Sequence, residues 1–118
     1  MILRAAALWA LGASAVAAQD ADCVRTPTQF DINVCAGRAA QAADDELNRL
    51  WKIVKPRADA RGEGQALLEA QRAWLKYRDA TCEMERASYG AGSMAPAAFA
   101  MCIERLTLER NAALRVLQ

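Results

Sequence analysis

The strongest constraint on this chain is a helical spacing of apolar residues that is interrupted at only two places. From Cys35 to Val54 apolar residues recur at intervals of three and four, a period that marks one face of an α-helix. The interruptions are 57–64, a polar stretch with two glycines, and 90–93, which reads Gly-Ala-Gly-Ser. No segment shows the convincing period-two alternation of a strand. The sequence therefore predicts three helices, at about 28–55, 65–89 and 96–117.

Residues with known preferences at helix ends set the limits of these helices. Thr28 is suited to cap the first helix, with Asp31 completing a capping box. Pro56 is expected to end that helix, because the residue before a proline avoids the helical region. Ser93 is a candidate cap for the third helix, whose first turn contains Pro96. Short connections favour antiparallel neighbours, so we predict an all-α, up-down-up three-helix bundle.

The second helix has apolar residues at intervals of seven, a spacing that suits packing between near-antiparallel helices. These residues predict its inner face, and they are Leu68, Leu75, Cys82 and Tyr89. On the first helix, Asp44 is expected to point towards solvent.

The first eighteen residues have the features of a secretory signal peptide. Arg4 precedes an apolar stretch over 5–15, and small residues follow where cleavage would occur. The apolar stretch is too short to span a bilayer comfortably, and Cys23 lies too far from the cleavage site for lipid attachment. We therefore predict a signal peptide at 1–18, a single domain at 19–118, and a periplasmic or secreted protein with no stable membrane anchor. A retained N-terminal anchor is the alternative.

Charge and the missing histidine exclude several classes of function. The chain contains no histidine, which removes His-dependent catalytic triads and the commonest zinc ligand. It has 15 basic and 14 acidic residues, and loss of Arg4 with the signal peptide would leave it neutral. A neutral protein lacks the basic excess that nucleic-acid binding requires. We expect a monomer that binds neither nucleic acid nor a cofactor or metal.

Four cysteines in an exported chain favour two disulfides. An up-down-up bundle places Cys35, Cys82 and Cys102 at the same end, and Cys23 in the leading segment can reach that end. Cys82 and Cys102 each lie ten residues from Gly92, which predicts the bridges Cys82–Cys102 and Cys23–Cys35. Pairing of Cys35 with Cys82 or Cys102 is the alternative. A zinc site or a thiol redox site is disfavoured because no Cys-x-x-Cys pair is present.

Three segments together resemble a known family. Residues 70–82 read AQRAWLKYRDATC, residues 43–48 read ADDELN, and residues 102–110 contain the pattern C-x-x-x-L-T-x-x-R. This combination resembles the LprI-type lysozyme-inhibitor N-terminal domain family, whose members share these three motifs. The resemblance covers essentially the whole chain after the predicted signal peptide.

The resemblance implies a small, exported, disulfide-linked helical protein of bacterial envelopes that inhibits a lysozyme stoichiometrically, without a cofactor. The chain differs from the lipoprotein that gives the family its name, because it lacks a lipidation cysteine at the cleavage site and a further domain after the motifs. We expect a binding protein rather than an enzyme. The alternative is an envelope structural or assembly module that binds another envelope protein through a helix face and inhibits nothing.

The polar and aromatic motif residues are interpreted as holding the helices in register. Asp44, Asp45 and Glu46 are consecutive, so on a helix they point in different directions and do not form the facing carboxylate pair of a glycosidase. Arg78 is expected to approach the inter-helix seam, where it could pair with Glu46 or bond to Thr107, and an exposed contact role is the alternative. The motif set is Asp44, Glu46, Asn48, Gln71, Trp74, Tyr77, Arg78, Asp79, Thr107 and Arg110.

The glycine-rich turn between the second and third helices is the candidate contact with a protein partner. It is short, and the expected Cys82–Cys102 bridge would tether it, which lowers the entropy lost when a loop enters a cleft. A plain inter-helix connection is the alternative. Lysozymes are often strongly basic, so a neutral inhibitor would need a local acidic patch for electrostatic steering. The candidate contact residues are Tyr89, Gly90, Gly92, Ser93 and Met94.

Overall fold

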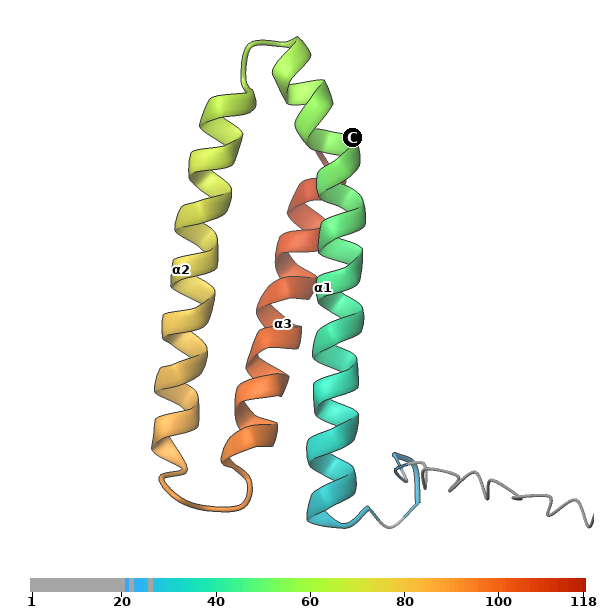
Figure 1. The fold of residues 1–118 in the computed structure, drawn as a ribbon, viewed down its shortest axis with the longest axis vertical. Helices are drawn as coiled ribbons and strands as arrows, with labels where there is room; N and C mark the ends of the chain where they lie inside the picture. Colours follow the sequence, from blue (N-terminus) through green and yellow to red (C-terminus); the bar gives the residue numbers. More distant parts are fainter. Residues whose placement is uncertain (1–20, 22, 26) are drawn as a thin grey trace, which may run out of the picture.

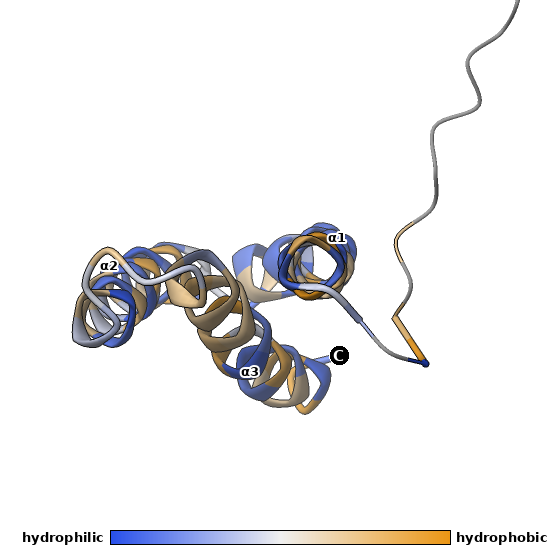
Figure 2. Ribbon diagram, turned by 90° about the horizontal axis from the view of Figure 1, so that it is seen from below, coloured by the Kyte–Doolittle hydropathy of each residue, from blue (hydrophilic) through white to orange (hydrophobic). Residues whose placement is uncertain are grey.

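The computed structural model describes residues 21, 23–25 and 27–118, and these form three antiparallel α-helices (Figure 1). α1 spans Gln29–Ala60, α2 spans Gly64–Ser88 and α3 spans Ala95–Arg115. No strand occurs in this part of the chain, so the expected all-α, up-down-up bundle is confirmed. Figure 2 shows that α3 lies between α1 and α2 and to one side of them. The predicted signal peptide, residues 1–18, lies outside the described residues.

The capping box at the start of α1 is confirmed. The backbone N–H of Asp31 donates to Thr28 Oγ1 (3.2 Å), and the backbone N–H of Thr28 donates to Asp31 Oδ2 (2.9 Å). The two bonds satisfy donors that the first turn of a helix leaves free.

The expectation that Pro56 ends α1 is wrong, because the helix continues for four residues to Ala60 with Pro56 inside it. A proline inside a helix loses one backbone hydrogen bond. The residues on either side, Val54 and Ala58, are both buried. Tertiary packing of this face therefore outweighs the local preference of the proline.

Replacing Pro56 with alanine is expected to raise the free energy of unfolding by about 1 kcal/mol, because alanine restores the missing N–H, while the greater flexibility of the unfolded chain offsets part of the gain. Urea denaturation would measure the change. Pro96→Ala is the matched control, since Pro96 lies in the first turn of α3, where a missing N–H has little effect. Equal changes in both variants would contradict the explanation.

The turn before α3 also differs from expectation. The N-cap of α3 is Met94 rather than Ser93, and no side chain caps the helix. Gly90 has a φ of 57°, the left-handed conformation that glycine adopts most readily. A Cβ at Gly92 would lie 2.9 Å from the Tyr89 carbonyl oxygen, so the close approach of the chain here requires glycine. These two glycines allow α2 and α3 to be joined tightly.

The core consists of two apolar clusters, one towards each end of the bundle. The first contains Leu47, Leu50, Val54 and Leu114, with Trp51, Leu67 and Trp74 packed against it. The second contains Cys82, Cys102 and Leu106, with Phe99 and Ile103 packed against it. Both clusters pack against α3, which explains its central position.

The inner face expected for α2 is only partly buried. Of its four apolar residues at intervals of seven, Cys82 is fully buried, whereas Leu68 and Leu75 are half-buried and Tyr89 is 50% exposed. The expectation that Tyr89 packs inside is therefore wrong. Tyr89 is exposed because it follows the last residue of α2 as its C-cap. Leu68 and Leu75 are only half-buried because they line a cavity between α1 and α2.

Both expected disulfides are confirmed, Cys23–Cys35 and Cys82–Cys102, with Cα–Cα distances of 5.9 and 5.4 Å. Cys82 and Cys102 are completely buried, whereas Cys23 is exposed. The Cys82–Cys102 bridge therefore belongs to the core, and the Cys23–Cys35 bridge ties the leading segment to α1. No helix in the described part of the chain is long and apolar enough to span a membrane.

Candidate functional site

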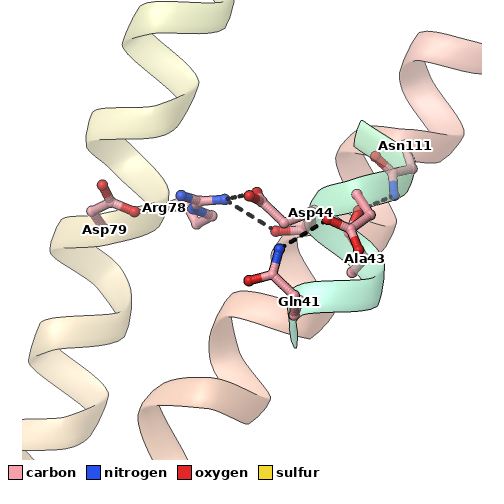
Figure 3. Close-up of polar contacts among 8 residues, drawn as sticks. Gln41, Ala43, Asp44, Arg78, Asp79 and Asn111 are labelled. Carbon is pink, nitrogen blue, oxygen red and sulfur yellow. Dashed lines mark hydrogen bonds and ion pairs between the residues drawn. The ribbon is translucent and has the colours of Figure 1, made fainter. Parts of the chain in front are cut away.

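A layer of polar side chains lies between the two apolar clusters, and Arg78 of α2 is its centre. Arg78 Nη1 donates to Asp44 Oδ1 of α1 (3.1 Å) and to Thr107 Oγ1 of α3 (3.4 Å). Its Nε donates to Asp79 Oδ1 (3.0 Å). Figure 3 shows the guanidinium reaching from α2 across to Asp44. The side chain of Arg78 is only 12% exposed, so one largely covered cation connects all three helices.

The structure confirms the expected bond from Arg78 to Thr107 and corrects the expected ion pair. Arg78 pairs with Asp44 rather than with Glu46, and Asp44 faces the inter-helix seam instead of pointing fully to solvent. Glu46 instead binds Arg49 on its own helix (2.7 Å) and Arg115 of α3 (3.0 Å). Because the two acidic residues are two positions apart on a helix, they point to different neighbours.

Hydrogen bonds from Arg49 and Arg115 lower the pKa of Glu46 from its ordinary 4.5 to about 2. A carboxyl group with a lowered pKa in the folded state stabilises the fold above its unfolded pKa, and that contribution is lost as the pH falls through the folded pKa. We expect Glu46→Gln to destabilise the protein modestly at pH 7 and to have little effect at pH 2. Urea denaturation at several pH values would measure this, and an equal loss at both pH values would contradict it.

Trp74 contacts two guanidinium groups, those of Arg78 and Arg110. The Cζ atoms of Arg78 and Arg110 lie 5.2 and 5.9 Å from the centre of its ring, within the range of cation–π contact. Arg110 Nε also donates to Gln71 Oε1 (2.9 Å), and Gln71 is buried. Partial burial lowers the pKa of Arg110, although an arginine remains charged at neutral pH. Gln71, Trp74 and Arg110 thus join α2 to α3.

Asn111 is a buried polar residue that the sequence analysis missed. Its Nδ2 donates to the carbonyl oxygen of Ala43 (3.0 Å), a contact between α3 and α1 that Figure 3 shows. Within the described residues its Oδ1 has no hydrogen-bond partner. The sequence does contain a sign of this residue. Asn111 lies three residues before Leu114, on the apolar face of the third helix.

The remaining motif residues lie at the surface. Asn48 and Tyr77 are exposed, and Asp79 is 61% exposed although it binds Arg78. Asp45 accepts a hydrogen bond from Gln41 on its own helix (2.9 Å). The acidic run of α1 is therefore divided among three different sets of partners. Within the described residues, no group of three or more His, Cys, Asp or Glu side chains could hold a metal ion.

Two cavities open between α1 and α2, one on each side of the Asp44–Arg78 ion pair. The first has a volume of about 460 Å³ and is lined by residues of all three helices, among them Gly37, Asp79 and Phe99. We call this cavity the acidic trough, because three carboxylates line it. Its full lining is Gly37, Ala40, Gln41, Asp44, Arg78, Asp79, Glu83, Phe99 and Ile103. The second has a volume of about 350 Å³, and its lining is more apolar and includes Leu47, Trp51, Leu68 and Leu75. Both cavities exist because side chains of α1 and α2 do not fill the space between these two helices.

The turn that was expected to contact a partner lies at one end of the bundle. Tyr89, Gly90, Gly92 and Ser93 are exposed, whereas Met94 is half-buried. Gln29 at the start of α1 donates from Nε2 to the Met94 sulfur (3.5 Å). The turn is therefore held from both sides, by this contact and by the Cys82–Cys102 bridge.

The fold and these cavities define a small, disulfide-linked three-helix protein with an open groove beside its second helix. The profile of a protein family described as "Lysozyme inhibitor LprI" matches residues 18–114. The chain therefore belongs to the LprI lysozyme inhibitor family. It is also 36% identical over 108 residues to an uncharacterized protein of Rhizobium meliloti, covering 81% of this chain and 78% of that one. No solved structure matches the chain.

Proposed function

We propose that this protein is an exported inhibitor that binds a lysozyme in a one-to-one complex, without a cofactor. The observation that carries the proposal is the family match, which extends over all three helices and both disulfides. Disulfides of this kind persist in oxidising compartments such as the periplasm and the cell exterior. Either location would place the inhibitor where lysozymes attack the cell wall.

The exposed turn between α2 and α3 is the proposed first contact with the enzyme. Binding restricts a loop, and a loop that is already held loses less entropy. Gln29 and the buried Cys82–Cys102 bridge hold this turn in the free protein. Tyr89 is the large side chain that the turn exposes, and aromatic residues are enriched among those that dominate binding energy.

A wall-clearing assay tests the proposal directly. Oxidised protein lacking residues 1–18 would be titrated against several lysozyme types, with clearing of bacterial cell walls as the readout. We expect inhibition that saturates near one equivalent and disappears when the disulfides are reduced. Substoichiometric inhibition would indicate an enzyme rather than an inhibitor that binds one-to-one.

Absence of inhibition at a large excess, for every lysozyme tested, would contradict the proposal. It would favour a role as an envelope assembly module, since the open groove between α1 and α2 could also bind another envelope protein. Co-purification with a native envelope protein from the source cells would then be the appropriate measurement.

A further inference from the structure

The acidic trough is built by one face of each helix. Gly37, Ala40 and Asp44 are spaced three and four residues apart, so they share one face of α1. Gly37 and Ala40 have small side chains, so they leave the space beside α1 unfilled. A Cβ at Gly37 would meet nothing within 4 Å. The trough is therefore a feature of the backbone packing and is not closed by any side chain of the described chain.

The opposite wall and the floor differ in chemistry. Asp79 and Glu83 are four residues apart on α2 and are 61% and 56% exposed. Phe99 and Ile103 are four apart on α3 and half-buried against the Cys82–Cys102 cluster. The trough thus has an apolar floor and carboxylates at its upper edge.

The lining of the trough has more negative than positive groups, and the negative groups are the more exposed to solvent. Three carboxylates line the trough, those of Asp44, Asp79 and Glu83, against the one guanidinium of Arg78. Arg78 is only 12% exposed, whereas all three carboxylates are more than one-third exposed. Glu83 also pairs with Arg86 farther along α2 (2.7 Å). The cation of the lining lies deep, and the anions remain accessible from outside.

We propose that the acidic trough binds an arginine or lysine side chain of a protein partner. The methylene groups would lie on Phe99 and Ile103, and the cationic end would reach the carboxylates of Asp79 and Glu83. Long basic side chains bury their stems on apolar surface while the charged end stays near water. A volume of about 460 Å³ lies within the range of pockets that bury small ligands, which is ample for one such side chain.

This proposal deepens the proposed function in one respect. A lysozyme as the partner rests on that function, and the strongly basic surface of many lysozymes would supply the side chain. Glu83 and Phe99 each lie within two turns of the α2–α3 connection, so one partner could contact the turn and the trough together. The local anionic surface gives a chain with a formal net charge of +1 the electrostatic complementarity that its net charge does not provide.

The steric test uses Gly37→Leu, which fills the trough and leaves every charge in place. Because Gly37 lies inside α1 and a Cβ there meets open space, leucine is expected to preserve or increase stability. Loss of binding in this variant is therefore not explained by unfolding. Thermal denaturation of the variant would verify this before binding is measured.

The direct probe is a triarginine peptide added to the isotopically labelled protein, with amide chemical shifts as the readout. We expect shifts centred on Gly37, Ala40, Phe99 and Ile103, weakened by added salt because charge interactions are screened. Gly37→Leu should lose about tenfold or more in affinity, because leucine would occupy the space that the arginine side chain enters. Shifts that lie elsewhere, or that persist unchanged in Gly37→Leu, would overturn the proposal.

A pair of double variants tests the charge. Asp79→Asn with Glu83→Gln removes two carboxylates from the trough, and Glu63→Gln with Glu69→Gln removes two from outside it. We expect the first pair to weaken triarginine binding several-fold and the second to leave it nearly unchanged. Equal weakening in both would indicate attraction to the overall charge and would contradict a specific site.

The same variants separate this proposal from the proposed function. If the wild-type protein inhibits a lysozyme and Gly37→Leu inhibits it equally well, the trough is not the binding site and the inhibitor function stands. If no lysozyme is inhibited but triarginine still binds in the trough, the inhibitor function fails and the basic-side-chain site stands.

Discussion

Replacing Cys82 and Cys102 with alanine is expected to lower the free energy of unfolding by about 3–5 kcal/mol. The bridge closes a loop between residues 20 apart in sequence, and removing it gives the unfolded chain more freedom. Both sulfurs are also fully buried in the cluster with Leu106, so alanine leaves unfilled space in the core. For a domain of this size the melting temperature should fall by roughly 15–30 °C.

The matched control removes the other bridge by Cys23→Ala with Cys35→Ala. That bridge spans 12 residues, and Cys23, Val24 and Arg25 are exposed. Releasing this segment increases the freedom of the folded chain as well as the unfolded one, so the two effects partly cancel. We expect a loss of about 1–2 kcal/mol. Urea denaturation of the three proteins would measure the difference, and an equal loss in both variants would contradict it.

Much of the fold was predictable because local sequence and tertiary packing agree. Thr28 and Asp31 satisfy the first turn of α1 by themselves, and Gly90 adopts the conformation that a tight turn needs. The cysteine pairing followed from topology, since antiparallel helices bring Cys82 opposite Cys102. Consistency of local and global preferences is what makes such features readable from sequence.

The features that were not predictable depend on how the helices pack. Pro56 has a strong local preference that the packing of α1 outweighs. The choice between Asp44 and Glu46 as the partner of Arg78 depends on a rotation of α1 that the apolar period does not specify. The acidic trough depends on the distance between α1 and α2. A sequence motif within one helix does not determine that distance.

Arg78→Met is expected to lower the free energy of unfolding by about 2 kcal/mol. The substitution keeps a long apolar stem but removes the charge-assisted hydrogen bonds to Asp44, Asp79 and Thr107. Thr107 is fully buried, so its hydroxyl would lose a partner in a place that water does not reach. Asp44 is 38% exposed, and its partial hydration limits the loss.

Arg78→Lys tests whether the shape of the guanidinium matters in addition to its charge. A lysine ammonium cannot present the fixed planar set of donors that reaches Asp44 and Asp79 at once, and it stacks less well on Trp74. We therefore expect Arg78→Lys to recover only part of the stability lost in Arg78→Met. Full recovery would mean that charge alone holds the layer together.

A double-mutant cycle between Arg78→Met and Asp44→Asn would measure how strongly these two residues couple. We expect a coupling energy of about 1 kcal/mol, because the cation is mostly covered and shared among three helices. The Arg86–Glu83 pair on the same helix has a shorter contact of 2.7 Å, but its side chains are 46% and 56% exposed. Its cycle, with Arg86→Met and Glu83→Gln, should give only about 0.3–0.5 kcal/mol. A coupling at Arg78 no larger than at Arg86 would mean that the Asp44–Arg78 pair does not set the register of α1 against α2.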